Sequence, residues 1–147
     1  LEEFGPGTSF NRILPETGKL VMRTKVQRII LCSGKVYYDL LAAREEMNIS
    51  NVALIRVEQL YPFPEVSLAK ELEKYPNADV VWCQEEPENM GAWTYLDRRL
   101  EKLLGNSEIK AKRPIYVGRP EAASPATGSL SKHNSEQKVL VDEALTI

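Results

Sequence analysis

The sequence predicts an α/β fold in which helices cover both faces of a mostly parallel β-sheet. Three observations predict it: short continuous apolar runs, amphipathic segments between them, and turns rich in Gly, Pro and Ser at the junctions. Strands that are buried on both faces are typically continuous apolar runs. Alternation of such strands with helices is typical of parallel sheets with right-handed crossovers.

The first 24 residues are predicted to be an N-terminal linker segment. They contain Gly5, Pro6, Gly7, Pro15 and Gly18, which favour turns and extended chain. Residues 20–22 are expected to form a short edge strand, and residues 25–147 to form one domain, as the length of 147 residues suggests. Because the chain begins without Met, we expect it to be a piece of a longer protein.

Regular alternation begins at Arg28. The four predicted buried strands are residues 28–32, 52–57, 80–83 and 115–117. The first predicted helix has apolar residues at helical spacing from Val36 to Met47, and the second begins after Pro64 and has its apolar face between Leu68 and Tyr75. The third begins near Trp93 and stops at Gly105. A last helix begins near His133 and ends at Leu145.

The composition excludes several classes of protein. The chain has 19 basic and 21 acidic residues, a net charge of −2, whereas nucleic-acid binders usually have a basic excess. No apolar run approaches the roughly 20 residues of a membrane helix. Cys32 and Cys83 lie within predicted apolar strands, so we expect buried, reduced and unreactive thiols.

Few residues suggest catalytic chemistry. His133 is the single histidine, and we expect a structural residue that bonds to nearby backbone at a helix start. No His, Cys, Asp and Glu residues have metal-site spacing, and the phosphate-binding glycine motifs are absent from the sequence. Residues alone therefore indicate an α/β domain without the parts of an independent enzyme.

Three turns remain candidates for function. Ser33, Gly34 and Lys35 precede a predicted helix, where free backbone N–H groups could hold an anion, although an ordinary turn fits equally. Glu85 and Glu86 could act as acid and base, or could accept backbone N–H groups or pair with Arg. The turn with Tyr61 and Phe63 is made rigid by two prolines, and it could pack at an interface or bind a small ligand.

The sequences of these turns and of the segments around them resemble those of a known protein family. The matching blocks are residues 32–40 (CSGKVYYDL), 56–64 (RVEQLYPFP), 82–93 (WCQEEPENMGAW), 118–120 (GRP), 123–128 (ASPATG), His133 and residues 136–137 (EQ). In this order they resemble the C-terminal domain of the thiamine-dependent first component of the 2-oxoglutarate dehydrogenase complex. The resemblance runs from about Gly7 to Leu145. Pyruvate dehydrogenases and transketolases share the domain type but resemble these turns less closely.

The resemblance implies a transketolase C-terminal domain fold, with three layers and a mixed five-stranded sheet whose first, edge strand is antiparallel. It also implies a homodimer that decarboxylates 2-oxoglutarate on thiamine diphosphate with Mg²⁺ in the tricarboxylic acid cycle. The succinyl group then passes to a lipoyl arm of the dihydrolipoyl succinyltransferase component. Because other domains of that family hold the cofactor and the metal, no catalytic, cofactor or metal residue is assigned here, and the chain alone is expected to be inert.

The strand order of that family predicts a crevice between the strands that end at Cys32 and Cys83. Ser33, Gly34 and Lys35 form one side, and Glu85 and Glu86 form the other. Arg119 and Arg12 are the remaining candidate cations for a regulatory nucleotide, AMP or acetyl-CoA. Alternatively, Arg119 pairs with Glu85 or Glu86 and the crevice binds no anion. The expected compartment is a bacterial cytoplasm, with the mitochondrial matrix as the alternative.

Overall fold

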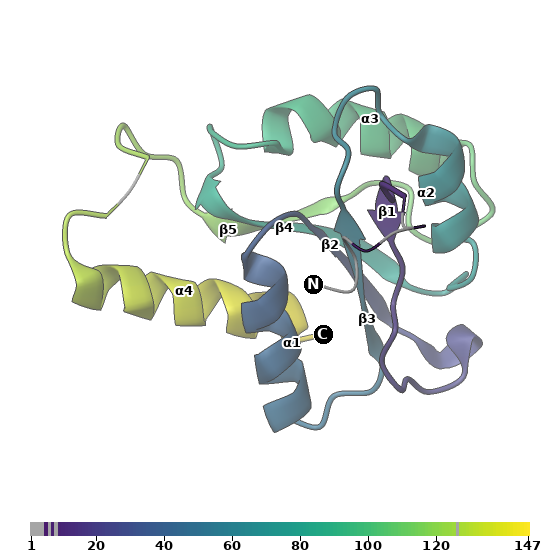
Figure 1. Ribbon diagram of the computed structural model, residues 1–147, viewed down its shortest axis with the longest axis horizontal. Helices are drawn as coiled ribbons and strands as arrows, with labels where there is room; N and C mark the ends of the chain where they lie inside the picture. Colours follow the sequence, from purple (N-terminus) through teal and green to yellow (C-terminus); the bar gives the residue numbers. More distant parts are fainter. Residues whose placement is uncertain (1–4, 6, 8, 126) are drawn as a thin grey trace.

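The computed structural model describes residues 5, 7, 9–125 and 127–147. It contains a five-stranded sheet with the order β1-β3-β2-β4-β5 (Figure 1). The strands are β1 (Ile13–Leu14), β2 (Arg28–Cys32), β3 (Val52–Val57), β4 (Asp79–Pro87) and β5 (Ile115–Arg119). β1 is antiparallel to β3, and all other neighbours are parallel. The mixed sheet with an antiparallel edge strand is confirmed.

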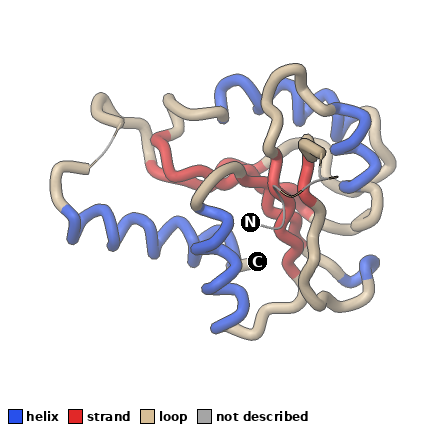
Figure 2. Tube along the Cα trace, in the orientation of Figure 1, coloured by secondary structure: helices blue, strands red, loops and turns tan. Residues whose placement is uncertain are grey.

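Four α-helices cover the two faces of this sheet, and a short 3₁₀ helix precedes β2. The helices are η2 (Arg23–Lys25), α1 (Val36–Glu46), α2 (Glu65–Leu72), α3 (Trp93–Gly105) and α4 (Leu130–Leu145). α2 and α3 lie on one face, and α1 and α4 lie on the other (Figures 1 and 2). The predicted three-layer α/β/α fold is therefore confirmed. Among the described residues, none of the helices combines the length and apolar character needed to cross a bilayer.

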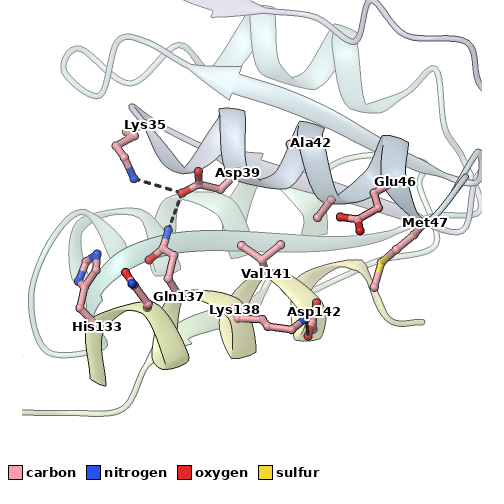
Figure 3. Close-up of a pocket in the computed structure, with 12 residues that line it drawn as sticks. Lys35, Asp39, Ala42, Glu46, Met47, His133, Gln137, Lys138, Val141 and Asp142 are labelled. Atoms are coloured by element: carbon pink, nitrogen blue, oxygen red, sulfur yellow. Dashed lines mark hydrogen bonds and ion pairs between the residues drawn. The ribbon is translucent and has the colours of Figure 1, made fainter. Parts of the chain in front are cut away.

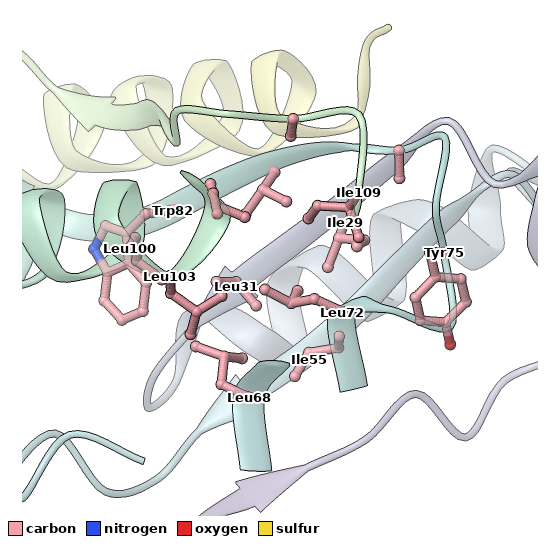
Figure 4. Packing of buried hydrophobic residues seen from close by; sticks show 14 of the residues in the cluster. Ile29, Leu31, Ile55, Leu68, Leu72, Tyr75, Trp82, Leu100, Leu103 and Ile109 are labelled. Carbon is pink, nitrogen blue, oxygen red and sulfur yellow. The ribbon is translucent and has the colours of Figure 1, made fainter. Parts of the chain in front are cut away.

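Each face of the sheet has its own apolar core, because side chains alternate along a strand. In β2, Ile29 and Leu31 point into the core under α2 and α3, which also contains Trp82 (Figure 4). Ile30 and Cys32 point into the core under α1 and α4. Burial of one large apolar side chain stabilises a fold by about 1.5–3 kcal/mol, so continuous apolar strands favour a sheet covered on both sides.

The predicted edge strand at residues 20–22 is wrong. The edge strand is β1, where Ile13 lies opposite Val57 and Leu14 lies opposite Arg56. Leu20 and Val21 instead pack against the core under α2 and α3. A two-residue strand is too short to have a recognisable periodicity, which explains why the sequence did not reveal it. Residues 1–4, 6, 8 and 126, which belong to the predicted linker and to the ASPATG block, lie outside the described residues.

β4 is longer than predicted. Residues 84–87 were expected to form a turn, but they continue the strand, and Pro87 pairs with Arg119 of β5 after a register shift beyond Cys83. The predicted neighbouring strands are confirmed, since Cys32 of β2 and Cys83 of β4 are register partners. In the sheet, β3 lies on one side of β2 and β4 lies on the other side. The direction in which successive strands are added therefore reverses between β2 and β4. In open α/β sheets this is where ligands usually bind.

Candidate functional site

The predicted crevice lies at the carboxyl edge of the sheet, between the ends of β2 and β4. Gly34 makes the turn from β2 into α1 with a φ of +74°, a conformation that glycine adopts without steric cost. This turn places Lys35 directly before α1, beside Glu85 of β4. The structure thus brings together two of the predicted sides, the Ser33–Lys35 turn and Glu85.

Lys35 is held between two carboxylates. Its Nζ lies 3.2 Å from Oδ2 of Asp39 and 3.7 Å from Oε1 of Glu85, while its side chain is 68% exposed. The hydrogen bond with Asp39, together with the charge of Glu85, raises the pKa of Lys35 above its usual value. An anion at this position would therefore compete with two carboxylates for one ammonium group.

Arg119 faces α4 rather than the crevice carboxylates. Its guanidinium is buried, with Nε 3.1 Å from Oε2 of Glu136 and Nη2 3.0 Å from Nδ1 of His133. The same Nη2 donates to Oε1 of Gln137 at 3.4 Å. Neither alternative for Arg119 is found: it does not face solvent in the crevice, and its carboxylate partner is Glu136 rather than Glu85 or Glu86. The reason is that α4 packs beside β5 and presents three polar side chains to Arg119.

The side chain of His133 binds Arg119 of β5, whereas we expected it to bond to nearby backbone at the helix start. A guanidinium can only donate, so Nδ1 of His133 must accept this hydrogen bond and the ring proton resides on Nε2. Gln137 continues the network toward α1, since its Nε2 donates to Oδ2 of Asp39 at 2.8 Å. Side chains of α1, β5 and α4 thereby form one connected polar network.

Between α1 and α4 lies a groove of about 900 Å³ (Figure 3). Lys35, Asp39 and Gln137 lie at one end, and Val141 and Met47 contribute apolar surface farther along. Two charged groups on its rim form an ion pair, with Lys138 Nζ 2.9 Å from Oδ2 of Asp142. Within the part of the chain that the structure describes, no group of three or more His, Cys, Asp or Glu side chains could hold a metal ion.

Gln84 is a buried residue that the sequence analysis did not single out. Its Oε1 accepts from Nε1 of Trp82 at 2.9 Å and from the backbone N–H groups of Ala92 and Trp93 at 3.2 and 3.1 Å. Its Nε2 donates to the carbonyl of Met90 at 2.8 Å. One amide thus fixes both the turn after β4 and the start of α3. The only signal in the sequence was a polar residue directly after an apolar strand.

A second amide connects the turn after β4 to the loop after β5. Oδ1 of Asn89 accepts from the backbone N–H of Ala122 at 3.1 Å, and its Nδ2 donates to the carbonyl of Ala122 at 3.0 Å. Glu85 is half-buried and Glu86 is exposed on the strand that ends at this turn. The two predicted carboxylates are therefore carried by the end of β4, next to a turn that Asn89 bonds to the loop after β5.

Arg12 and the aromatic turn lie at the other end of the same edge. The carbonyl of Arg12 accepts from the N–H groups of Glu58 and Gln59 at 3.0 and 3.1 Å, which places Arg12 beside the end of β3. Two strands, β3 and β2, separate this position from β4. Tyr61 is 81% exposed, whereas Phe63 is half-buried and packs against the core under α2 and α3. The structure thus does not bring Arg12 to Glu85.

Comparison with known proteins identifies the family. A family model described as 2-oxoglutarate dehydrogenase C-terminal matches residues 1–145. The chain is 48% identical over 153 residues to the 2-oxoglutarate dehydrogenase E1 components of Brucella anthropi and Brucella ovis, and 47% identical to that of Brucella abortus. Each alignment covers 99% of this chain and 15% of the relative, so the chain spans about 15% of the length of these proteins. The chain belongs to the 2-oxoglutarate dehydrogenase C-terminal family.

Proposed function

We propose that this chain is the C-terminal domain of a 2-oxoglutarate dehydrogenase E1 component and supports the assembly of that enzyme. The observation that carries the proposal is the family match over residues 1–145, together with 48% identity over 99% of the chain. The whole enzyme decarboxylates 2-oxoglutarate on thiamine diphosphate and Mg²⁺. It then passes the succinyl group to the lipoyl arm of the succinyltransferase component, in a bacterial cytoplasm.

The described residues do not fit thiamine diphosphate and Mg²⁺. They include no group of three or more candidate metal ligands. Two of the cations predicted for the crevice are paired: Lys35 with Asp39 and Glu85, and Arg119 with Glu136. Cofactor binding is therefore assigned to the remainder of the enzyme, and no chemical step is assigned to this chain.

The carboxyl edge of the sheet offers an interface for the homodimer or for a neighbouring domain. Tyr61 follows β3, Tyr38 lies in the first turn of α1 after β2, and Phe10 precedes the antiparallel strand β1, so all three belong to this edge. They are 81%, 59% and 70% exposed, respectively. Aromatic side chains bury a large area for little lost entropy and are enriched in interfaces. The half-buried Phe63 fixes the turn that presents Tyr61.

The alternative, a module that senses AMP or acetyl-CoA at the crevice, has less support. Such a module needs cations that are free to bind phosphate, and Lys35 and Arg119 both have carboxylate partners. Glu85 and Asp39 would also repel the ligand. Calorimetry with AMP and acetyl-CoA on the whole enzyme and on its Lys35→Ala variant tests it. Binding that depends on Lys35 favours the sensing module.

Truncation of the whole enzyme tests the proposed role. Removal of the residues equivalent to 13–147 is expected to abolish both the dimer and 2-oxoglutarate-dependent release of CO₂. The 147-residue chain alone, supplied with 2-oxoglutarate, thiamine diphosphate and Mg²⁺, is expected to release no CO₂ above background. Turnover by the chain alone, or a truncated enzyme that stays dimeric and active, would contradict the proposal.

A further inference from the structure

The outer edge of β3 is only partly covered by a strand. β1 has two residues and pairs with Arg56 and Val57 alone. Farther along β3, the backbone groups of Val52 and Leu54 that face outward have side-chain partners instead. The N–H of Leu54 donates to Oε2 of Glu16 at 2.6 Å, and the carbonyl of Val52 accepts from Nη1 of Arg44 at 3.0 Å.

Glu16 and Arg44 also bind each other, although they are 28 residues apart in the chain. Nη2 of Arg44 donates to Oε1 of Glu16 at 3.1 Å, and Nη1 donates to Oε2. The two side chains are only 4% and 5% exposed. Together they present an acceptor and a donor to β3, as the backbone of a neighbouring strand would.

The chain on either side of Glu16 follows the same edge. Ile13 lies opposite Val57 at one end of β3, and the N–H of Val21 donates to the carbonyl of Ser50 at 2.9 Å at the other end. We call residues 13–21 the edge segment. Gly18 within it passes directly over the ion pair, since a Cβ built there would lie 2.6 Å from Nη2 of Arg44.

We propose that the edge segment blocks the addition of a strand to β3 and that the Glu16–Arg44 ion pair holds this segment in place. When the ion pair is lost, β3 forms strand hydrogen bonds with β3 of a second copy of the chain. An open strand edge presents unpaired N–H and C=O groups and is a template for pairing with another chain. β3 suits such pairing because the β-branched residues Val52, Ile55 and Val57 favour strands. Two identical edges can meet antiparallel about a two-fold axis, which closes the assembly at a dimer.

At neutral pH the charges of Glu16 and Arg44 favour the state in which the edge segment covers β3. Burial alone raises the pKa of Glu16, but hydrogen bonds from Arg44, Leu54 and Gly18 outweigh it, and the pKa lies below the ordinary value of 4.5. The stabilisation from Glu16 is therefore complete above about pH 4.5 and is lost as the pH falls through the lower folded-state pKa. Arg44 from α1 is the charged partner of Glu16, and Tyr75 is a neighbouring titratable group whose pKa the charge of Glu16 helps to raise. Tyr75 also interacts with Glu71 of α2 and Arg23 of η2.

Sedimentation velocity of the 147-residue chain over a range of concentrations tests this proposal, together with amide hydrogen exchange. Glu16→Ala is expected to form dimers as concentration rises. In dilute solution its Leu54 amide should exchange at least about tenfold faster than in the parent, because the acceptor is gone. A synthetic peptide of residues 12–21 should return the variant to the monomer, and the same peptide carrying Glu16→Ala should not.

Glu58→Gln is the matched control, because Glu58 lies just beyond β3 and pairs with Arg56 at 2.9 Å without touching the outer edge at Val52 and Leu54. It should behave as the parent does. If Glu16→Ala does not fold, Glu16→Gln keeps the side-chain length and an acceptor but loses the ion pair, and should still exchange faster at Leu54. A folded variant that stays monomeric with parental exchange at Leu54 would overturn the proposal, and so would equal association of the control.

Discussion

Gly91 lies directly against the side-chain amide of Gln84. A Cβ built at Gly91 would lie 2.9 Å from Nε2 of Gln84, and the φ of Gly91 is +64°. Both the contact and the left-handed backbone conformation exclude a side chain there. Because Gln84 also fixes the start of α3, this pair determines how β4 connects to the next helix.

Substitutions at three glycines should separate the cost of the steric clash from the cost of backbone strain at a positive φ. Gly91→Ala combines strain with a clash and should lower the free energy of unfolding by about 2–4 kcal/mol. Gly34→Ala carries a positive φ but has nothing within 4 Å, so strain alone should cost about 1–2 kcal/mol. Gly105→Ala has neither feature and should be neutral or slightly stabilising. Urea unfolding followed by circular dichroism measures all three, and an equal loss at Gly91 and Gly105 would contradict the explanation.

Loss of the Gln84 amide should be more costly than its single position suggests. Gln84→Leu leaves the indole N–H of Trp82 and the backbone N–H groups of Ala92 and Trp93 without their acceptor. A buried donor left unpaired costs about 1–3 kcal/mol, and the indole N–H is buried while the two backbone N–H groups are part-buried, so we expect a loss of about 3 kcal/mol in total. Gln84→Glu keeps the acceptor and should restore exchange protection at Trp93 more than Gln84→Leu does. Chemical denaturation and amide exchange measure both effects. A Gln84→Leu variant that is more stable, or better protected at Trp93, than Gln84→Glu would contradict this prediction.

The sequence predicted the parallel part of the fold because burial leaves a local pattern. Strands β2 to β5 are apolar runs, and the helices between them have apolar residues at helical spacing. The edge strand was misplaced because Leu20 and Val21 look like a strand, while Ile13 and Leu14 form one only through β3. The local pattern of apolar residues indicates which segments are buried, but it does not indicate which edge of the sheet a segment pairs with.

The polar contacts were less predictable, because they join residues far apart in the chain. Glu16 and Arg44 are separated by 28 residues, and no spacing rule connects them. The predicted position of Lys35 at the crevice is correct, because the turn after β2 determines it. Its ion pair with Glu85 could not be predicted, because that pair depends on the register of β2 against β4. The pairing of Arg119 with Glu136 was not among the predicted alternatives, because the position of α4 beside β5 cannot be predicted from either segment alone.

The two thiols should be inert in the folded chain. Cys32 and Cys83 are buried register partners, and burial raises the pKa of Cys32 to about 12 and that of Cys83 further still. The thiolate is the reactive form, so almost none is present at pH 8. Labelling with a thiol reagent should be slow in buffer and fast, with two equivalents, in denaturant. Rapid labelling of either thiol in buffer would show that the burial is wrong.

If the carboxyl edge belongs to the proposed dimer interface, loss of its exposed aromatic ring should weaken that dimer in the whole enzyme. Tyr61→Ala removes an 81% exposed ring and should leave the domain as stable as before, while raising the dimer dissociation constant about tenfold or more. Tyr61→Ala combined with Phe63→Ala should weaken the dimer at least as much and also lower stability, because Phe63 packs against the core. Analytical ultracentrifugation gives both constants.

Val139→Ala is the matched control for the aromatic edge. Val139 is also an exposed apolar residue, but it lies on α4, away from Tyr61. Its substitution should leave the dissociation constant unchanged. Equal dimer constants for Tyr61→Ala and the parent enzyme would remove the carboxyl edge from the interface.

The role of this chain as the C-terminal domain of a 2-oxoglutarate dehydrogenase E1 component can be tested by a domain exchange. The most direct measurement replaces the matching region of the Brucella anthropi E1 component, 48% identical to it, with this chain. 2-Oxoglutarate-dependent CO₂ release is then compared among the chimera, the parent and a truncated protein that lacks the region. We expect a dimeric chimera whose activity is close to that of the parent, and a truncated protein that is inactive. A folded chimera that is no more active than the truncated protein would contradict it.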